Sequence, residues 1–309
     1  MPDSTLTPIV SVIIPTHNRA SLLPRAVLSV LGQTMTSLEC IVVDDASSDD
    51  TPAVVQGFAS DERFRYIRHE SNKGGSAARN TGIKASRGQY IALLDDDDEW
   101  LPSKLEKQMH LFTKCPAAVG LVYCWMDYHD SRGQLMKEHH PTCRGYVFPL
   151  LLGSNEIGGC PTLVLRKEVV EAVGGFDESL TIEDDWDFVL RVCKRVEVDV
   201  VPEVLVRVDY GHGLPQVSRV SLESKRDCLQ AIACAEAKLR LVLDEPRKYR
   251  HHISHYYAQE IYLYGRLGLW GRALSALISA LRAYPLNFNA IGLTIRTVLR
   301  GITKRGIAT

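Results

Sequence analysis

Two nearly uninterrupted runs of β-branched and other apolar residues near the N-terminus constrain the fold of this chain most strongly. They read IVSVIIP at residues 9–15 and LECIVVDD at residues 38–45. A strand without polar alternation is typical of a parallel sheet that is covered on both faces. Helix-forming segments alternate with further strands, and right-handed connections place such helices on both faces. The sequence therefore predicts an α/β fold with a doubly wound, mostly parallel sheet, whose further strands are expected at residues 64–69, 89–95 and 117–126.

The composition excludes several classes of protein. With 309 residues, 45% of them hydrophobic, the chain can bury a proper core in one large domain or two. A net charge of −1 gives no electrostatic reason to expect binding of nucleic acid. The 8 cysteines include no CxxC pair, which argues against a zinc or redox motif. We expect a cytoplasmic protein, because there is no signal-peptide pattern and no apolar stretch of the ~18 residues that a membrane span requires.

Charge is unevenly distributed along the chain. No acidic residue follows Glu260, whereas seven lysines and arginines do. A basic tail of this kind is a candidate for peripheral contact with an anionic surface such as the inner face of the membrane. Residues from 221 onward are expected to be helical, and residues 251–285 resemble a single TPR-type helical pair. Residues 286–306 are amphipathic and basic, so we expect them either to lie on a membrane surface or to dock as a plain helix.

Polar residues follow three of the expected strands at the point where each strand ends. The segments are PTHN after the first strand, DDASSDD after the second and DDDDE after the fourth. In open α/β sheets, ligands bind beyond the carboxyl ends of the strands. We therefore expect these three segments to meet at one edge of the sheet and to form the functional site.

The run LLDDDDEW at residues 93–100 contains the densest negative charge. Side chains of an extended segment alternate between faces, so Asp95 and Asp97 are expected on one side and Asp96 and Asp98 on the other. Two carboxylates at this spacing suit Mg²⁺ or Mn²⁺, which prefer oxygen ligands and often share them with a diphosphate. The alternatives are a solvated acidic loop or the N-terminus of a helix ahead of Pro102.

Five motifs in register resemble the family 2 glycosyltransferases of GT-A fold. They are VSVIIPTHNRA, CIVVDDASSDDT, NKGGSAARNTGI, YIALLDDDDEW and GGFDESLTIEDDWDFVLRV, and the resemblance spans about residues 8–212. It implies an inverting transfer of a sugar from a nucleotide diphosphate donor, such as a UDP-sugar, to a saccharide or lipid-linked acceptor. It further implies a catalytic domain over residues 1–220, with a donor half at about 8–100 and an acceptor half at about 101–220, before a helical region at 221–309.

The resemblance assigns five residues to the nucleotide and its phosphates. Pro15 and Thr16 would border the nucleotide through backbone contacts. Asp45 would accept a hydrogen bond from the imide of the nucleobase, the alternative being a helix cap in the following loop. Lys73 and Arg79 would balance the phosphates, although Arg79 is equally expected to pair with the aspartates as a counter-charge.

The acidic run corresponds to the DxD motif of the resembled family, which implies a metal-dependent enzyme using Mn²⁺ or Mg²⁺. Asp97 would bind the metal, and Asp95 or Asp96 would bind the ribose or a metal-bound water. His212 matches a histidine that in some relatives contacts the metal or the diphosphate, and the alternative for it is a structural role. Such a metal would neutralise the charge that develops on the leaving diphosphate.

A single inverting displacement also needs a base for the attacking hydroxyl. Alignment of TIEDDWDFVLRV through Arg191 makes Asp185 the expected base, the alternative being a capping acid. Trp186 is expected either to stack on a sugar or to pack in the core. Two other functions compete: a nucleotidyltransferase, which usually has a glycine-rich phosphate loop that PTHNRA lacks, and an inactive nucleotide-sugar-binding scaffold. The sequence leaves the oligomeric state open.

Overall fold

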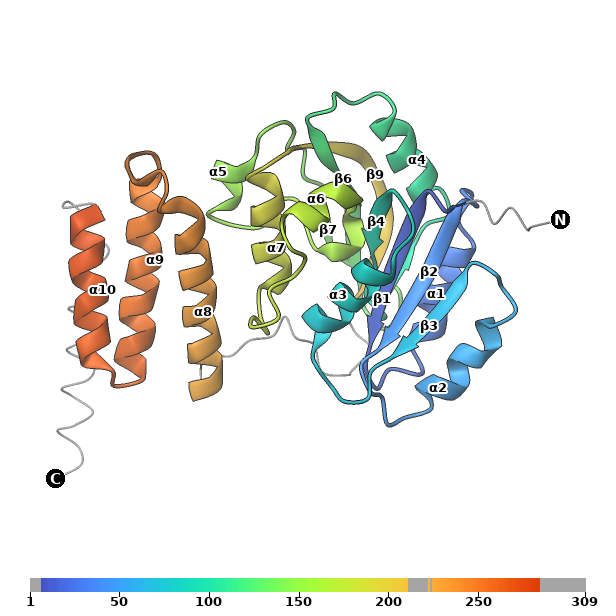
Figure 1. The fold of residues 1–309 in the computed structure, drawn as a ribbon, viewed down its shortest axis with the longest axis horizontal. Coiled ribbons are helices and arrows are strands. Elements are labelled where there is room, and N and C mark those ends of the chain that lie inside the picture. The colour runs from blue at the N-terminus through green and yellow to red at the C-terminus, as the bar shows by residue number, and fades with distance from the viewer. Residues whose placement is uncertain (1–6, 211–221, 223, 284–309) are drawn as a thin grey trace. The chain divides into compact units, whose positions relative to one another are not determined.

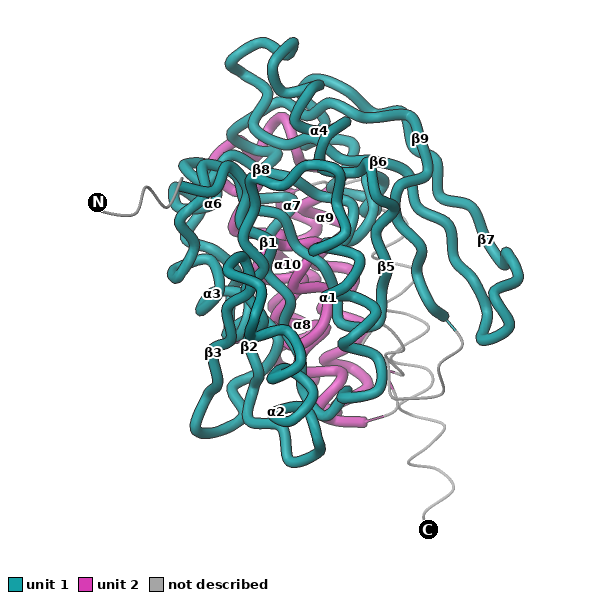
Figure 2. Tube along the Cα trace, turned by 90° about the vertical axis from the view of Figure 1, so that its right-hand side faces the viewer, with its two compact units in different colours: residues 1–178, 188–215 teal, residues 179–187, 216–309 magenta. Residues whose placement is uncertain are grey.

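The computed structural model describes residues 7–210, 222 and 224–283 of the chain. The chain divides into two compact units, shown in different colours in Figure 2: residues 1–178 with 188–215, and residues 179–187 with 216–309. Residues 179–187 thus belong to the same unit as the C-terminal helices, although the residues on either side of them belong to the first unit. The sequence patterns do not predict this grouping.

The described strands of the first unit form one nine-stranded sheet in the order β3-β2-β1-β4-β8-β6-β9-β5, with β7 paired to β6. The pairs β1–β2, β1–β4, β2–β3 and β6–β9 are parallel. Strands β8 and β5 run antiparallel to their neighbours. The expected α/β fold is confirmed. The strands are β1 (Val10–Thr16), β2 (Leu38–Asp44), β3 (Phe64–Arg68), β4 (Tyr90–Leu93), β5 (Asp98–Trp100), β6 (Val119–His129), β7 (Leu135–His139), β8 (Val164–Arg166) and β9 (Glu197–Asp209).

Helices alternate with these strands along the chain, and Figure 1 shows β2 lying between β1 and β3 in the sheet. On one face of the sheet, Val12 belongs to the same buried cluster as Val27 of the first helix. On the other face, Ile41 packs with Ala78 of the third helix. The apolar runs are thus buried on both faces, as expected. The helices are α1 (Leu23–Leu31), α2 (Thr51–Val54), α3 (Gly75–Ala85), α4 (Lys104–Phe112), α5 (Phe148–Leu151), α6 (Lys167–Ala172), α7 (Asp184–Cys193), α8 (Lys225–Val242), α9 (Pro246–Arg266) and α10 (Trp270–Ala283).

Gly82 allows α3 to approach β1 closely, and its replacement by alanine is expected to destabilise the fold. A Cβ atom at this position would lie 2.4 Å from Cγ2 of Ile13. Overpacking of this kind costs about 1–3 kcal/mol of unfolding free energy, which urea denaturation would measure. Gly57→Ala is the matched control, because a Cβ there has nothing within 4 Å. Equal stability of the two variants would contradict the close approach.

The second unit contains three described helices, α8, α9 and α10. Ala258 and Ile261 of α9 are buried against Ala276 and Ala280 of α10, so small residues let these two helices pack closely. The expected helical pair is present, although α9 begins at Pro246, five residues before the expected start at residue 251. No helix in the described part of the chain is long and apolar enough to cross a membrane. The basic segment 286–306 lies outside the described residues.

Candidate active site

Asp95, Asp96 and Asp97 form a turn between β4 and β5, and Asp98 is the first residue of β5. Strand β4 ends at Leu93, and the backbone N–H of Asp98 donates to the carbonyl oxygen of Asp95 at 3.2 Å. The expectation of an extended segment here is wrong, because β5 pairs antiparallel with β9 instead of continuing β4. Exposure nevertheless alternates along the run: Asp95 and Asp97 are partly exposed, whereas Asp96 and Asp98 are buried.

Two arginines from distant segments pair with this turn. NH1 of Arg19 lies 2.5 Å from Oδ2 of Asp97 and 3.3 Å from Oδ1 of Asp96. NH2 of Arg79 lies 2.7 Å from Oδ1 of Asp95. The counter-charge alternative for Arg79 is therefore observed. Arg19 was missed as a site residue, although its position in the polar turn after the first strand was a usable signal.

Burial raises the pKa of the two inner carboxyl groups. It raises the pKa of Asp96 to about 7, against the attraction of Arg19, and the charges of Asp97 and Asp95 act in the same direction as burial. Burial also raises the pKa of Asp98 well above its usual range, again with help from Asp97 and Asp95. Asp96 and Asp98 are thus buried, whereas Asp95 and Asp97 remain partly exposed to solvent.

The exposed pair suits a metal that shares its ligands with a substrate. Among the described residues, no group of three or more His, Cys, Asp or Glu side chains is arranged to hold a metal ion alone. Mg²⁺ usually takes only one or two carboxylates and completes its shell with phosphates and water, so Asp95 and Asp97 fit such an ion. His212 lies outside the described residues. The alternative of a helix N-terminus is wrong, because α4 begins only at Lys104.

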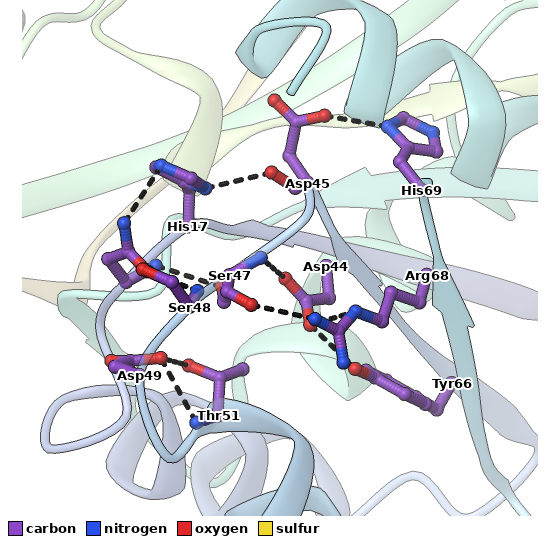
Figure 3. A network of polar contacts seen from close by, with 11 residues as sticks. His17, Asp44, Asp45, Ser47, Ser48, Asp49, Thr51, Tyr66, Arg68 and His69 are labelled. Carbon is purple, nitrogen blue, oxygen red and sulfur yellow. Dashed lines mark hydrogen bonds and ion pairs between the residues drawn. The ribbon is translucent and has the colours of Figure 1, made fainter. Parts of the chain in front are cut away.

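Asp45 is a buried carboxylate, and Figure 3 shows its contact with His69. Its Oδ1 lies 2.7 Å from Nδ1 of His69 and accepts the backbone N–H of Lys73 at 2.8 Å. Its Oδ2 accepts the N–H of Gly74 at 2.7 Å. Gly74 has a φ of 93°, which glycine adopts readily. These contacts differ from the alternative of a helix cap in the loop after Asp45. Asp45 instead holds the backbone at the start of α3. The side chain of Lys73 is exposed.

The neighbouring carboxylate, Asp44, has a different environment and points away from Asp45 in Figure 3. It is fully buried, accepts the hydroxyl of Tyr66 at 2.6 Å and the N–H of Ser47 at 2.7 Å, and lies 3.7 Å from Nε of Arg68. These contacts fix the turn after β2. Asp44 thus has a structural role that the sequence did not reveal, whereas Asp45 lies next to the loop after β1.

The loops that follow β1 and β2 are joined by hydrogen bonds. The N–H of Asp45 donates to the carbonyl oxygen of Thr16 at 2.9 Å, and the N–H of Asn18 donates to the hydroxyl of Ser47 at 2.9 Å. Thr16 is buried and Pro15 is partly buried. The backbone beside Pro15 and Thr16 is therefore held in place, which is what a backbone-lined nucleotide site requires.

Asp185 lies in the first turn of α7, where the helix dipole favours a carboxylate. Its Oδ1 accepts the N–H of Trp186 at 2.7 Å. The ring of Trp186 packs against Nζ of Lys238, which lies 3.3 Å from the ring centroid. One face of the indole is therefore used in packing, which agrees with the packing alternative for this residue.

Curated relatives align with the greater part of the chain. A glycosyltransferase of Rickettsia typhi, named as uncharacterised, is 32% identical over 214 residues, which are 67% of this chain and 65% of the relative. TuaG of Bacillus subtilis is 34% identical over 162 residues, which are 52% of this chain and 63% of the relative. The chain thus spans less than two thirds of the length of these relatives.

Solved structures share the fold at lower identity. Residues 1–349 of TarS from S. aureus, in complex with UDP-GlcNAc, superpose with a TM-score of 0.65 at 16% identity, covering 89% of both chains. The mannosyltransferase PcManGT of Pyrobaculum calidifontis, in complex with GDP-Man and Mn²⁺, superposes with a TM-score of 0.52 at 18% identity, covering 98% of this chain and 83% of that one. The expected GT-A fold is confirmed by this likeness.

The family model described as glycosyl transferase family 2 matches residues 11–174, which include β1, the acidic turn and the loops beside it. This range is more than half of the chain. Of the five motifs that carry the resemblance, it contains the first except for one residue and the next three completely. The chain belongs to glycosyl transferase family 2.

Proposed function

We propose that the protein is an inverting glycosyltransferase that moves a sugar from a nucleotide diphosphate donor to an acceptor hydroxyl. The observation that supports this most is the acidic turn, which presents Asp95 and Asp97 while Asp96 and Asp98 are buried. The turn follows β4, which pairs with β1, so it belongs to the carboxyl edge of the parallel strands. Ligands of open α/β sheets bind at this edge.

The nucleotide is proposed to lie along the joined loops at Pro15, Thr16 and Asp45. An ionised carboxylate offers about four lone-pair positions, and Asp45 accepts three hydrogen bonds, so one position remains for an imide N–H of the base. We propose a UDP-sugar as the donor. TarS was crystallised with UDP-GlcNAc and PcManGT with GDP-Man, so the fold accommodates more than one base.

The diphosphate is proposed to lie near the exposed carboxylates and the basic residues of α3 and its preceding loop. Asp97 would hold Mn²⁺ or Mg²⁺, and Asp95, which is more exposed than Asp96, would contact the ribose or a metal-bound water. A bound dication would neutralise charge on the leaving diphosphate. Arg79 and Lys73 would contribute positive charge to the same phosphates.

Asp185 is proposed as the base. The acceptor oxygen attacks the anomeric carbon and forms the new glycosidic bond, while the bond to the diphosphate breaks and its electron pair leaves with the nucleotide. Asp185 takes the proton of the acceptor hydroxyl, on the side opposite the leaving group. Inversion of the anomeric centre follows from this single displacement. The acceptor is proposed to be a saccharide or lipid-linked glycan of cell-surface polysaccharide synthesis. The relative TuaG, whose name assigns it to teichuronic acid biosynthesis, supports this proposal.

Calorimetric titration of UDP, GDP and dTDP, with and without Mn²⁺, tests the donor site. We expect one nucleotide, UDP, to bind only or much more tightly when Mn²⁺ is present, because Asp97 would hold the metal and its charge would offset that of the diphosphate. A folded protein that binds none of the three in the presence of Mn²⁺ would show that the donor site is wrong and would favour an inactive scaffold.

A further inference from the structure

The segment that carries Asp185 is held by α8. Leu180 is buried with Cys234 and Ala237 of that helix. The thiol of Cys234 donates to the carbonyl oxygen of Ile182 at 3.1 Å. At the start of the segment, the N–H of Thr181 donates to Oε1 of Gln230 at 3.0 Å. One side of α8 therefore contacts residues 180–182 through apolar packing and through two hydrogen bonds from its side chains to the backbone of the segment.

A buried charge of α8 is directed to the same segment. Lys238 is 4% exposed, and its Nζ lies 2.6 Å from Oε2 of Glu183 and 3.3 Å from the ring centroid of Trp186. A buried ammonium is unfavourable unless it is paired. Here the carboxylate of Glu183 and the ring of Trp186 compensate the charge of Lys238. Because these two residues flank Asp184 and Asp185, the position of the lysine and the position of the segment depend on each other.

Glu183 is also the point where the chain turns into α7. Its φ is 53°, a conformation that residues other than glycine and asparagine rarely adopt. Its carbonyl oxygen accepts the N–H of Asp187 at 3.0 Å, the first hydrogen bond of the helix. Sparsely populated conformations persist where the surroundings hold them and often occur at functional sites. The contact of Glu183 with Lys238 therefore acts on the residue that sets the direction of the first helical turn.

We propose that Lys238 is a positioning residue for Asp185, and that the side of α8 that carries Cys234 and Lys238 supports the catalytic segment. The inference rests on the proposed function of Asp185 as the base. Lys238 acts through Glu183 and Trp186, which flank Asp184 and Asp185 in the sequence. Misplacement of a catalytic group by about 1 Å can reduce a rate by about 10²-fold, so loss of these contacts affects turnover without removing a reacting group.

The first test compares Lys238→Met with Lys238→Arg. Release of nucleoside diphosphate from UDP-, GDP- and dTDP-sugars, with water as the acceptor of the sugar, gives turnover, and calorimetry with UDP and Mn²⁺ gives donor affinity. For Lys238→Met we expect kcat to fall by about 10- to 10²-fold, with the dissociation constant of UDP changed by less than about twofold. Lys238→Arg retains a cation that can pair with a carboxylate and stack on an aromatic ring, so it should restore most of the activity. Unchanged turnover in Lys238→Met would overturn the inference.

Hydrogen exchange gives a second readout that does not require activity. In Lys238→Met, the amides of residues 180–187 should exchange faster, while those of residues 44–49 and 95–98 should not change. Unchanged exchange across residues 180–187 would overturn the positioning role. If the wild-type protein releases no nucleoside diphosphate from any of the sugar nucleotides, the proposed function fails, and the exchange experiment still decides whether Lys238 holds this segment.

Ile232→Ala separates positioning from general loss of stability. Ile232 is buried in the same helix but belongs to a cluster with Leu263 and Tyr264 of α9. This variant should lower Tm while kcat, measured well below Tm, stays near the wild-type value. An equal fall of kcat in Ile232→Ala would show that any damage to α8 suffices and would contradict the inference. A double-mutant cycle of Lys238→Met with Glu183→Gln should be non-additive in ln kcat, because both changes alter one contact; additivity would also contradict it.

Discussion

Replacement of Asp185 by asparagine is expected to lower kcat by about 10²- to 10⁴-fold, the usual contribution of a general base. Asparagine keeps the size of the side chain and the oxygen that accepts the N–H of Trp186, but it cannot take the proton of the acceptor. The dissociation constant of UDP with Mn²⁺ should change by less than about twofold, because only the proton acceptor is lost. Single-turnover kinetics and calorimetry on the same preparation would measure both quantities.

Asp184→Asn is the matched comparison for this experiment. Asp184 lies in the same turn of α7 and is also partly buried, so the two variants lose the same charge at the same end of the helix. We expect Asp184→Asn to lower kcat by less than about tenfold, since the proton acceptor remains. A large loss of kcat in Asp184→Asn, together with a near-normal kcat in Asp185→Asn, would show that Asp184 is the general base. Loss of nucleotide affinity in Asp185→Asn would contradict the assignment as base.

The second large effect is expected for Asp97→Asn. If Asp97 holds the metal, this variant should bind UDP equally with and without Mn²⁺, and its turnover should fall by about 10²-fold or more. A metal contributes several kcal/mol to the stabilisation of developing charge, and 1.36 kcal/mol corresponds to about tenfold in rate. Calorimetry in Mn²⁺ and in a chelator would measure the first quantity, and initial rates the second.

Glu99→Gln is the control for Asp97→Asn. Glu99 lies two residues further along the same acidic run, is partly exposed and has its carboxylate 3.9 Å from NH1 of Arg207. The variant Glu99→Gln removes the same amount of charge from the run as Asp97→Asn. A similar loss of turnover and of Mn²⁺-dependent UDP affinity in both variants would therefore indicate a diffuse electrostatic effect. If Asp97→Asn still binds UDP more tightly with Mn²⁺ than with a chelator, Asp97 is excluded as the metal ligand.

Local patterns were sufficient for the parallel half of the sheet. The runs at residues 9–15 and 38–45 correspond to β1 and β2, and the polar segments after them meet as expected. The antiparallel strand β5 was not predicted, because Asp98 and Glu99 are unfavourable strand residues and only pairing with β9 makes a strand of them. For the same reason the extended geometry expected for Asp95 and Asp97 was wrong.

The sequence by itself determined the order of the first elements and the family, because hydrophobic periodicity and motif spacing are local properties. Tertiary structure alone decided which charges meet. Arg19 pairs with Asp97 across 78 residues, and Lys238 pairs with Glu183 across 55. Such pairs depend on which strands are neighbours in the sheet and on which helices pack together. The position of a charged residue in the sequence does not identify its partner. Only the folded chain therefore shows that α8 contacts the segment that carries Asp185.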